Sequence, residues 1–155
     1  MVEVVYLDTS ALVKHYVTEP GSKWLDALLA AEDCLLVLTS HLTWVEATCA
    51  FARRAREGTL SAQDLEQVLR LLEYDITHRY HTLDVTPLTI DTARQLAVAQ
   101  PLRAYDAVQL ATAHLANREL VRAGKPPLVF LSADTRLVDI ARAIGLPTDN
   151  PNAHA

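Results

Sequence analysis

The sequence predicts an α/β fold with a central, mainly parallel sheet and helices on both of its faces. Short apolar runs of strand length alternate along the chain with longer segments whose apolar residues keep helical spacing. This alternation is typical of parallel sheets whose strands are joined by helices. A chain of 155 residues, of which 50% are hydrophobic, suffices for one ordinary core and is short for two. We therefore expect a single domain over residues 1–155.

Four segments are predicted to be strands. The first is β-branched and aromatic, and it is continuous enough for a buried central strand. The third is the weakest prediction, and the other two are short apolar runs that suit strands better than helices by their length. In chain order, the predicted strands cover residues 2–7, 35–39, 80–85 and 128–131.

Seven further segments are predicted to be helices. Ser40 is a good N-cap residue, and Ser61 with Asp64 resembles a capping box. Gly58 and Gly124 stand where a left-handed residue commonly closes a helix. The predicted helices cover residues 11–17, 22–31, 41–57, 61–78, 89–100 and 104–123, and the last runs from about Ser132–Asp134 to near residue 145.

Composition excludes several classes of protein. No apolar run is long enough to span a membrane, the first residues lack the basic segment of a signal peptide, and the two cysteines form no CxxC pair. These features predict a cytoplasmic protein without a membrane segment. The net charge of −5, taken alone, argues against a nucleic-acid-binding protein, because such proteins usually carry a basic surface.

Two aspartates follow predicted strands. Asp8 comes directly after the first strand, and Asp134 comes shortly after the last. In open parallel sheets, ligands bind beyond the carboxyl ends of the strands. The simpler interpretation is that each aspartate caps the helix that follows it. Neither residue alone decides between these interpretations.

Two other acids lie on helical faces with apolar neighbours. Glu46 has Leu42, Cys49 and Ala50 as its helical neighbours, and an unpaired carboxylate in the middle of such a face is unfavourable. A position at the margin of the face, or a buried pair with an arginine, remains an alternative. Asp106 falls in the first turn of its helix, where the helix dipole favours an acid.

The four acids have a common explanation if the fold brings them to one end of the sheet. Their carboxylates would then repel one another and raise each other's pKa. Divalent cations remove this repulsion, and a site made only of carboxylates suits Mg²⁺ or Mn²⁺. Two such ions can activate a water and stabilise the leaving oxygen in the hydrolysis of a phosphodiester bond.

At four places the chain resembles the PIN-domain ribonucleases, in particular the VapC-type toxins of type II toxin–antitoxin systems. The opening strand with residues 8–13 (DTSALV) looks like the start of a PIN domain. Residues 42–46 (LTWVE), 103–111 (RAYDAVQLA) and 131–137 (LSADTRL) are similar to later motifs of the family, in the correct order. The resemblance covers nearly the whole chain.

This resemblance implies a PIN-like three-layer α/β/α sandwich and a metal-dependent endoribonuclease that hydrolyses RNA by metal-activated water. It also implies a homodimer and a cognate antitoxin protein as partner. By position, it implies that Asp8, Glu46, Asp106 and Asp134 are the catalytic residues and the ligands of Mg²⁺ or Mn²⁺. Ser10 matches a family hydroxyl that helps to hold the site.

Residues near the acids receive weaker assignments. Arg103 lies one turn before Asp106 and is a supporting residue that could reach a carboxylate or the substrate. Asp139 is an alternative to Asp134 as the fourth acid. A further group of residues is either a solvated face or a contact surface for RNA phosphates: Arg53, Arg54 and Arg56.

Apolar residues give two more predictions. We expect Tyr6, Trp24 and Trp44 to lie in the core, and we expect Cys49 to be a buried, unreactive thiol. Leu71 lies off the main apolar stripe of its helix, which leaves apolar surface for a second chain.

Other functions fit the sequence less well. A haloacid-dehalogenase-type phosphatase needs a second aspartate two residues after the first, where this chain has Ser10. A receiver domain needs an acidic pair after the first strand, which is also missing. A catalytically silent PIN-like binding module, or a PIN-type nuclease of RNA processing, remains an alternative to the toxin.

Overall fold

A five-stranded sheet in which every neighbouring pair of strands is parallel forms the centre of the computed structural model, which describes residues 2–155. The strand order is β3-β2-β1-β4-β5. The prediction of a parallel α/β fold is therefore confirmed. The strands are β1 (Glu3–Leu7), β2 (Leu35–Ser40), β3 (His81–Leu83), β4 (Val129–Leu131) and β5 (Thr148–Asp149).

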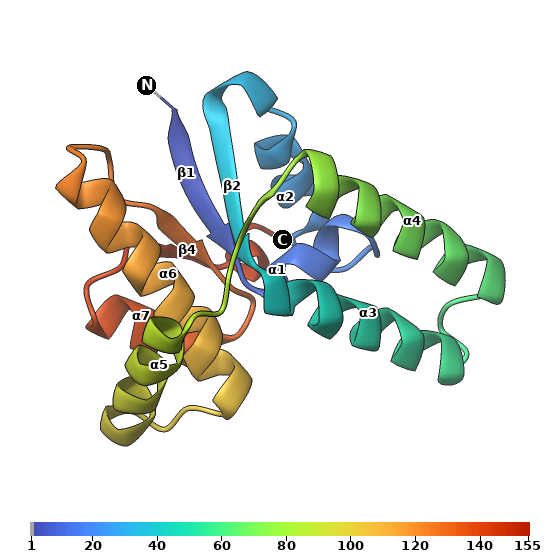
Figure 1. Ribbon diagram of the computed structural model, residues 1–155. Helices are drawn as coiled ribbons and strands as arrows, with labels where there is room; N and C mark the ends of the chain where they lie inside the picture. Colours follow the sequence, from blue (N-terminus) through green and yellow to red (C-terminus); the bar gives the residue numbers. More distant parts are fainter. Residues whose placement is uncertain (1) are drawn as a thin grey trace.

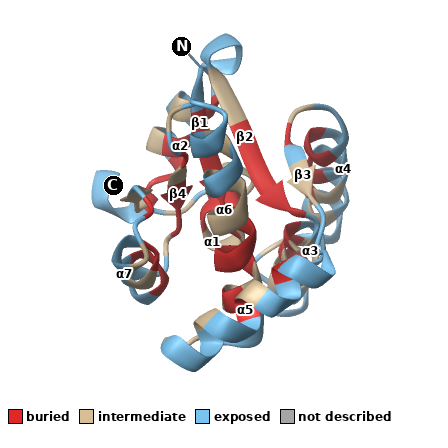
Figure 2. Ribbon diagram, turned by 60° about the vertical axis from the view of Figure 1, so that its left-hand side comes forward, coloured by how far each residue is buried: buried red, intermediate tan, exposed pale blue. Residues whose placement is uncertain are grey.

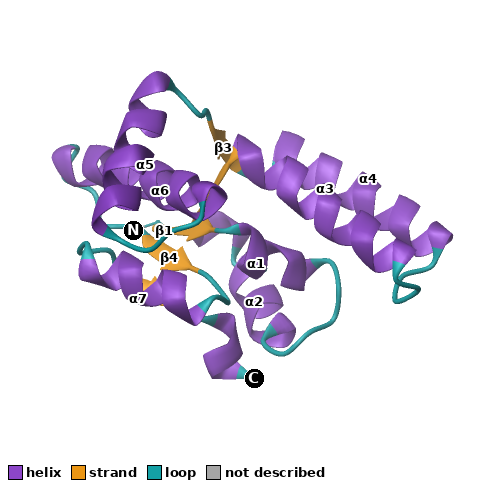
Figure 3. Ribbon diagram, turned by 90° about the horizontal axis from the view of Figure 1, so that it is seen from below, coloured by secondary structure: helices purple, strands orange, loops and turns teal. Residues whose placement is uncertain are grey.

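Helices cover both faces of this sheet and make it the middle layer of a three-layer sandwich (Figure 3). The first four helices pack on one face and the last three on the other. The helices are α1 (Thr9–Leu12), α2 (Ser22–Leu29), α3 (His41–Arg56), α4 (Ala62–His78), α5 (Pro87–Ala99), α6 (Ala104–Arg122) and α7 (Thr135–Ala143). Three short 3₁₀ turns cover Val13–His15, Glu32–Cys34 and Pro151–His154.

The core follows from the pattern of each strand. Alternate side chains of β1 enter opposite cores, with Val5 on the side of α1–α4 and Tyr6 on the side of α6 and α7. Figure 2 shows the central strands as mostly buried and the outer helical surfaces as exposed. Tyr6 stacks on Phe130 of β4 with 5.6 Å between the ring centroids, so the two central strands are also joined by their side chains.

Helices α3 and α4 form a hairpin that extends away from the sheet (Figure 1). Phe51, Val68 and Leu72 are buried in the hydrophobic core that the hairpin shares with α1, α2 and the sheet. Gly58 has a φ of 79° in the connection between the two helices, where its missing Cβ makes the left-handed conformation accessible. Leu71 is 50% exposed, as its place off the apolar stripe predicts.

Several element boundaries differ from the predictions. The first helix begins at Thr9 rather than residue 11, because Asp8 caps it, and it tightens into a 3₁₀ turn after Leu12. Helix α5 begins at Pro87, whose fixed φ suits the first turn of a helix. Strand β5 was not predicted, because two residues are too few to show a strand periodicity.

The topology brings the ends of β1 and β4 together. The chain leaves β1 toward β2 on one side and returns to β4 on the other, and the backbone N–H of Asp8 donates to the carbonyl of Leu131 at 3.1 Å. The place where the strand order changes direction in this way is called a topological switch point, and it leaves a crevice at the carboxyl ends of the strands. Across residues 2–155, no helix has both the length and the apolar character that crossing a membrane requires.

Candidate functional site

A cleft of about 780 Å³ opens at the carboxyl end of the sheet, between α1, α3, α6 and the loop after β4. Each of the four predicted acids lines it: Asp8, Glu46, Asp106 and Asp134. Ser10 and Arg103 line the same cleft. Asp139, the alternative fourth acid, lies exposed on α7 and pairs with Arg142 at 3.5 Å.

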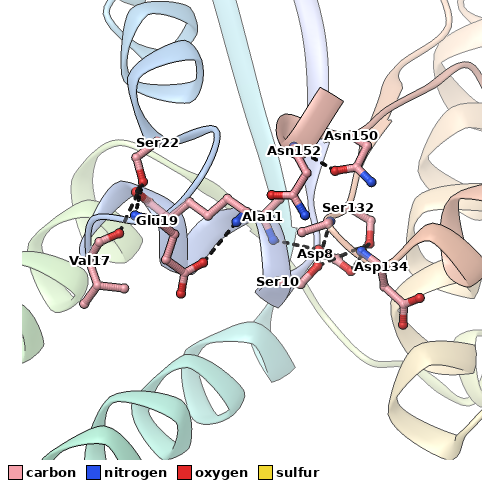
Figure 4. A network of polar contacts seen from close by, with 12 residues as sticks. Asp8, Ser10, Ala11, Val17, Glu19, Ser22, Ser132, Asp134, Asn150 and Asn152 are labelled. Atoms are coloured by element: carbon pink, nitrogen blue, oxygen red, sulfur yellow. Dashed lines mark hydrogen bonds and ion pairs between the residues drawn. The ribbon is translucent and has the colours of Figure 1, made fainter. Parts of the chain in front are cut away.

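Asp8 is held rigidly at the bottom of this cleft and is only 4% exposed. Its Oδ1 accepts hydrogen bonds from the Ser10 hydroxyl at 2.7 Å and from the N–H of Ala11 at 3.0 Å, and its Oδ2 accepts from the Ser132 hydroxyl at 2.7 Å. Figure 4 shows these donors around the carboxylate. Asp8 is therefore an N-cap, as the simpler interpretation predicts, and at the same time a residue of the cleft.

Burial raises the pKa of Asp8 from 3.8 to about 6. The hydrogen bonds from Ser132, Ala11 and Ser10 oppose this rise, because they stabilise the charged carboxylate, and the charge of Asp106 adds to it. A cation next to Asp8 would remove the cost of its buried charge.

Asp106 lies in the first turn of α6, as predicted, and is half-buried. Desolvation raises its pKa, and the negative charges of Asp134 and Glu46 raise it further. The positive charges of Arg103 and Arg136 act in the opposite direction. The acids of the cleft are thus close enough to repel one another.

Asp134 caps α7 from the exposed rim of the cleft. Its Oδ1 accepts from the N–H of Arg136 at 3.0 Å and from the N–H of Leu137 at 3.3 Å. Its own N–H donates to Ser132, whose hydroxyl also donates to Asp8. Ser132 thus joins the loop after β4 to the end of β1.

Glu46 extends from α3 toward α6 and α1. Its Oε1 accepts from the Gln109 amide at 2.8 Å and from the Thr9 hydroxyl at 3.0 Å. Of the two interpretations of its position, the structure supports the margin of the apolar face, because Glu46 is half-buried, Val45 is 61% exposed and Cys49 is exposed on the cleft side. Glu46 stays in place through its polar partners.

The acids fit a divalent cation by their chemistry. Carboxylate oxygens are the ligands that Mg²⁺ and Mn²⁺ prefer, and burial, together with the charges of neighbouring carboxylates, raises the pKa of Asp8 and Asp106. Among residues 2–155, no three His, Cys, Asp or Glu side chains already stand close enough together to hold a metal ion. The carboxylates would have to converge on a cation.

The cleft also has a basic side along α3. Arg53 and Arg56 line this side, are exposed and form no ion pair within the described part of the chain. Arg103, at the start of α6, lines the opposite side, is also exposed and likewise has no ion-pair partner among the described residues. Arg54 differs, because its guanidinium pairs with Glu19, which also accepts from Lys14 at 3.0 Å. The unpaired arginines of α3 therefore line the same cleft as the four acids, whereas Arg103 acts on Asp106.

Two predictions of burial are wrong. Cys49 is exposed, and Trp44 is 37% exposed. Both lie on α3, which packs on the sheet and on α4 with only part of its surface and faces the cleft with another part. Tyr6 is fully buried and Trp24 packs against the core, as expected.

Three polar residues that hold the acids were not singled out from the sequence. The position of Ser132 could have indicated a site residue, because Ser132 follows a strand and precedes Asp134. The position of Thr9 next to Asp8 was a weaker signal of the same kind. Gln109 had none beyond its place three residues after Asp106 on one helix face.

Comparison with known proteins agrees with the geometry. A family model of the PIN domain matches residues 5–143, and the chain therefore belongs to the PIN-domain family. Ribonuclease VapC45 of Mycobacterium tuberculosis is 35% identical over 142 residues, which cover 92% of either chain. Within the family, the chain thus groups with the VapC ribonucleases.

Solved structures share the fold at low identity. The structure of FitAB bound to an IR36 DNA fragment has a TM-score of 0.65 at 18% identity, covering 95% of this chain and 94% of that one. The crystal structure of VapBC2 from Rickettsia felis, bound to a DNA fragment from its promoter, has a TM-score of 0.62 at 12% identity, covering 95% and 98%. These matches confirm the PIN-like α/β/α architecture.

Proposed function

We propose that this chain is a metal-dependent endoribonuclease, the toxin of a type II toxin–antitoxin pair, built as one PIN domain over residues 1–155. The observation that carries the proposal is the position of Asp8, Glu46, Asp106 and Asp134 on one cleft at the switch point of the sheet. Membership of the VapC ribonucleases supports RNA as the substrate. The proposed place of action is the cytoplasm.

In this proposal Asp8, Glu46 and Asp106 hold Mg²⁺ or Mn²⁺, and Asp134 completes the site. When bound, a divalent cation would stabilise charge on the phosphoryl oxygens and activate water for attack on the phosphorus. Ser10 keeps the Asp8 carboxylate in one orientation through its hydroxyl. No side chain has to act as a nucleophile.

Metal removal tests the activity. Purified protein should cleave a panel of tRNA and rRNA fragments in Mn²⁺ or Mg²⁺, and cleavage should fall to background in EDTA and return when the metal is restored. The physical reason is that repelling carboxylates alone offer no positive charge to a phosphodiester. Undiminished cleavage in EDTA would contradict the metal requirement, and absence of cleavage in every metal would favour a silent binding module.

Arg53 and Arg56 are proposed to bind RNA phosphates beside the acids. They lie two to three helical turns beyond Glu46 on α3, line the cleft and have no ion-pair partner among the described residues. An arginine contacts phosphate with a planar set of donors, and each contact releases a counterion. Arg103 lies on the opposite side of the cleft, where it also moderates the pKa of Asp106.

Charge reversal at both positions (R53E/R56E) should therefore raise KM for RNA by about tenfold or more and flatten its dependence on salt, with kcat less affected. Steady-state cleavage at several salt concentrations measures this. The matched control is R118E/K125E, which makes the same change of charge at exposed residues away from the cleft. Equal KM values for the two double variants would exclude a role of these arginines in RNA binding.

Protein partners complete the proposal. The sequence resemblance implies an antitoxin partner, and the similarity of the fold to a toxin–antitoxin complex from Klebsiella pneumoniae supports it. A homodimer is supported by the exposed apolar side chains of α4 and α5, among them Leu71 and Leu88. A PIN-type nuclease of RNA processing has the same chemistry, and the RNA fragments that are cleaved distinguish it from a toxin.

A further inference from the structure

Gln109 is a polar side chain in the interior of the molecule, 2% exposed, at the centre of a network that joins three elements of the site. It lies on α6, one turn after Asp106. Its Nε2 donates to Glu46 Oε1 at 2.8 Å and to Thr43 Oγ1 at 2.8 Å on α3. Its Oε1 accepts from the Tyr6 hydroxyl at 2.6 Å on β1.

The orientation of this amide is determined by its partners. An ionised carboxylate only accepts hydrogen bonds, so the NH₂ group of Gln109 must face Glu46 and the carbonyl must face Tyr6. Tyr6 itself is fully buried and stacks on Phe130, so its hydroxyl is a fixed anchor. The rigid centre of the sheet therefore holds the amide, and the amide holds Glu46.

Glu46 needs such a support. It extends from the exposed side of α3, and the charge of Glu46 repels Asp106, whose pKa it helps to raise. Without a partner, repulsion and side-chain entropy would favour a conformation that points to solvent. Its Oε1 is occupied by Gln109 and Thr9, whereas its Oε2 accepts no hydrogen bond from residues 2–155. One carboxylate oxygen thus remains available for a ligand.

We propose that Gln109, anchored by Tyr6, is a positioning residue that keeps Glu46 in the cleft and thereby sets the affinity of the carboxylates for their divalent cation. This inference rests on the proposed function, because it assumes that the acids bind Mg²⁺ or Mn²⁺. Gln109 donates to a ligand and does not itself touch the cation. Partners of this kind typically change metal affinity by about 10- to 100-fold when they are removed.

The test is the variant Q109M, which keeps the shape of the side chain and removes the amide. Titration calorimetry with Mn²⁺ alone, without RNA, should give a Kd at least about tenfold weaker than in the wild type. In cleavage assays the Mn²⁺ concentration for half-maximal rate should rise by the same factor, while kcat at saturating Mn²⁺ stays within about threefold. A merely structural role would lower kcat or the Tm and leave the Mn²⁺ affinity unchanged.

A stricter test asks whether the effect of Q109M on Mn²⁺ affinity requires Glu46. Because Gln109 acts through Glu46, the double variant E46Q/Q109M should bind Mn²⁺ as E46Q does, within about twofold, since a shared mechanism makes the effects non-additive. The matched control is Q95M, the same substitution at an exposed position of α5, which should bind Mn²⁺ like the wild type. Additive effects of E46Q and Q109M would overturn the proposal.

The outcomes separate this inference from the proposed function. If the wild type binds no Mn²⁺, the metal-dependent function fails and the inference fails with it. If the wild type binds Mn²⁺ and Q109M binds it equally well, only the role of Gln109 is overturned. If Q109M does not fold, Y6F/Q109M leaves no hydroxyl unpaired, and the same weakening of Mn²⁺ binding is expected from it.

Discussion

Replacing Asp8 by asparagine should reduce RNA cleavage by on the order of 1,000-fold, because the stabilisation supplied by a metal at such a site is several kcal/mol. Asp8 is the most deeply buried of the four acids and the one with the most hydrogen-bond donors. Its charge is therefore maintained at a considerable cost of burial, which raises its pKa to about 6. A residue needed only as a helix cap would not have to be charged.

The fold should tolerate this substitution. The asparagine carbonyl can still accept from the Ser10 hydroxyl and from the N–H of Ala11, and its NH₂ can donate to the Ser132 hydroxyl. Asparagine is also as good an N-cap as aspartate. A loss of activity in D8N at an unchanged Tm would consequently report on the carboxylate and not on folding.

The control for D8N is D139N on α7. Asp139 is 65% exposed, lies away from the cleft and pairs only with Arg142 among the described residues. Initial rates of RNA cleavage in saturating Mn²⁺ should be unchanged for D139N and nearly abolished for D8N. Comparable rates for D8N and the wild type would refute the assignment of Asp8 to the site.

The sequence was informative where its pattern reflects topology. Asp8 and Asp134 follow apolar strands, and the ends of parallel strands on either side of a switch point meet in space. The structure brings both residues to one cleft with Asp106, although each also serves as a cap or lies in the first turn of a helix. The structural and functional interpretations of these acids were never exclusive.

The sequence was misleading along α3. Helical periodicity identifies one face, yet this helix leaves the sheet and packs on α4, so residues at core-like spacing line the cleft instead. Cys49 and Val45 are exposed for this reason. Which side of a projecting hairpin is covered depends on tertiary packing, and no local pattern in residues 41–56 records it.

The residues that support the acids could not be predicted from the sequence either. Gln109 lies among Ala107, Leu110 and Ala111 on a buried face, and a buried amide must find partners. That requirement identifies Gln109 as unusual, but it does not name Tyr6, which is 103 residues away in the chain. Contacts of this range follow from the strand order and become visible only in three dimensions.

The buried charge of Asp8 leads to the second large effect, a loss of stability of the metal-free protein as pH rises. The folded protein holds a proton on Asp8 with a pKa of about 6, against an ordinary value of 3.8. A carboxyl group whose pKa is raised by folding stabilises the folded state. This stabilisation is complete at pH values below the ordinary pKa and is lost as the pH rises through the pKa in the folded protein. The raised pKa of Asp106 acts in the same direction.

From the difference between 3.8 and about 6, the contribution of Asp8 to the free energy of unfolding should fall by up to about 3 kcal/mol between pH 4 and pH 7. Denaturant unfolding in EDTA across this range measures it. D8N corrects for the titrating groups that do not interact with Asp8, so the informative quantity is the difference in unfolding free energy between the wild type and D8N. A difference that does not change with pH would rule out this titration.

Mn²⁺ should reverse this loss of stability at the upper end of the pH range. A cation binds the ionised carboxylates and not the protonated ones, so its stabilisation of the folded state should be large at pH 7 and small at pH 4.5. The rise in Tm on adding Mn²⁺ should therefore grow with pH in the wild type and be much smaller in D8N at every pH. The charge of the buried Asp8 carboxylate disfavours the metal-free fold, and the cation is expected to neutralise that charge. An equal rise in Tm in the two proteins at pH 7 would therefore mean that Mn²⁺ binds elsewhere.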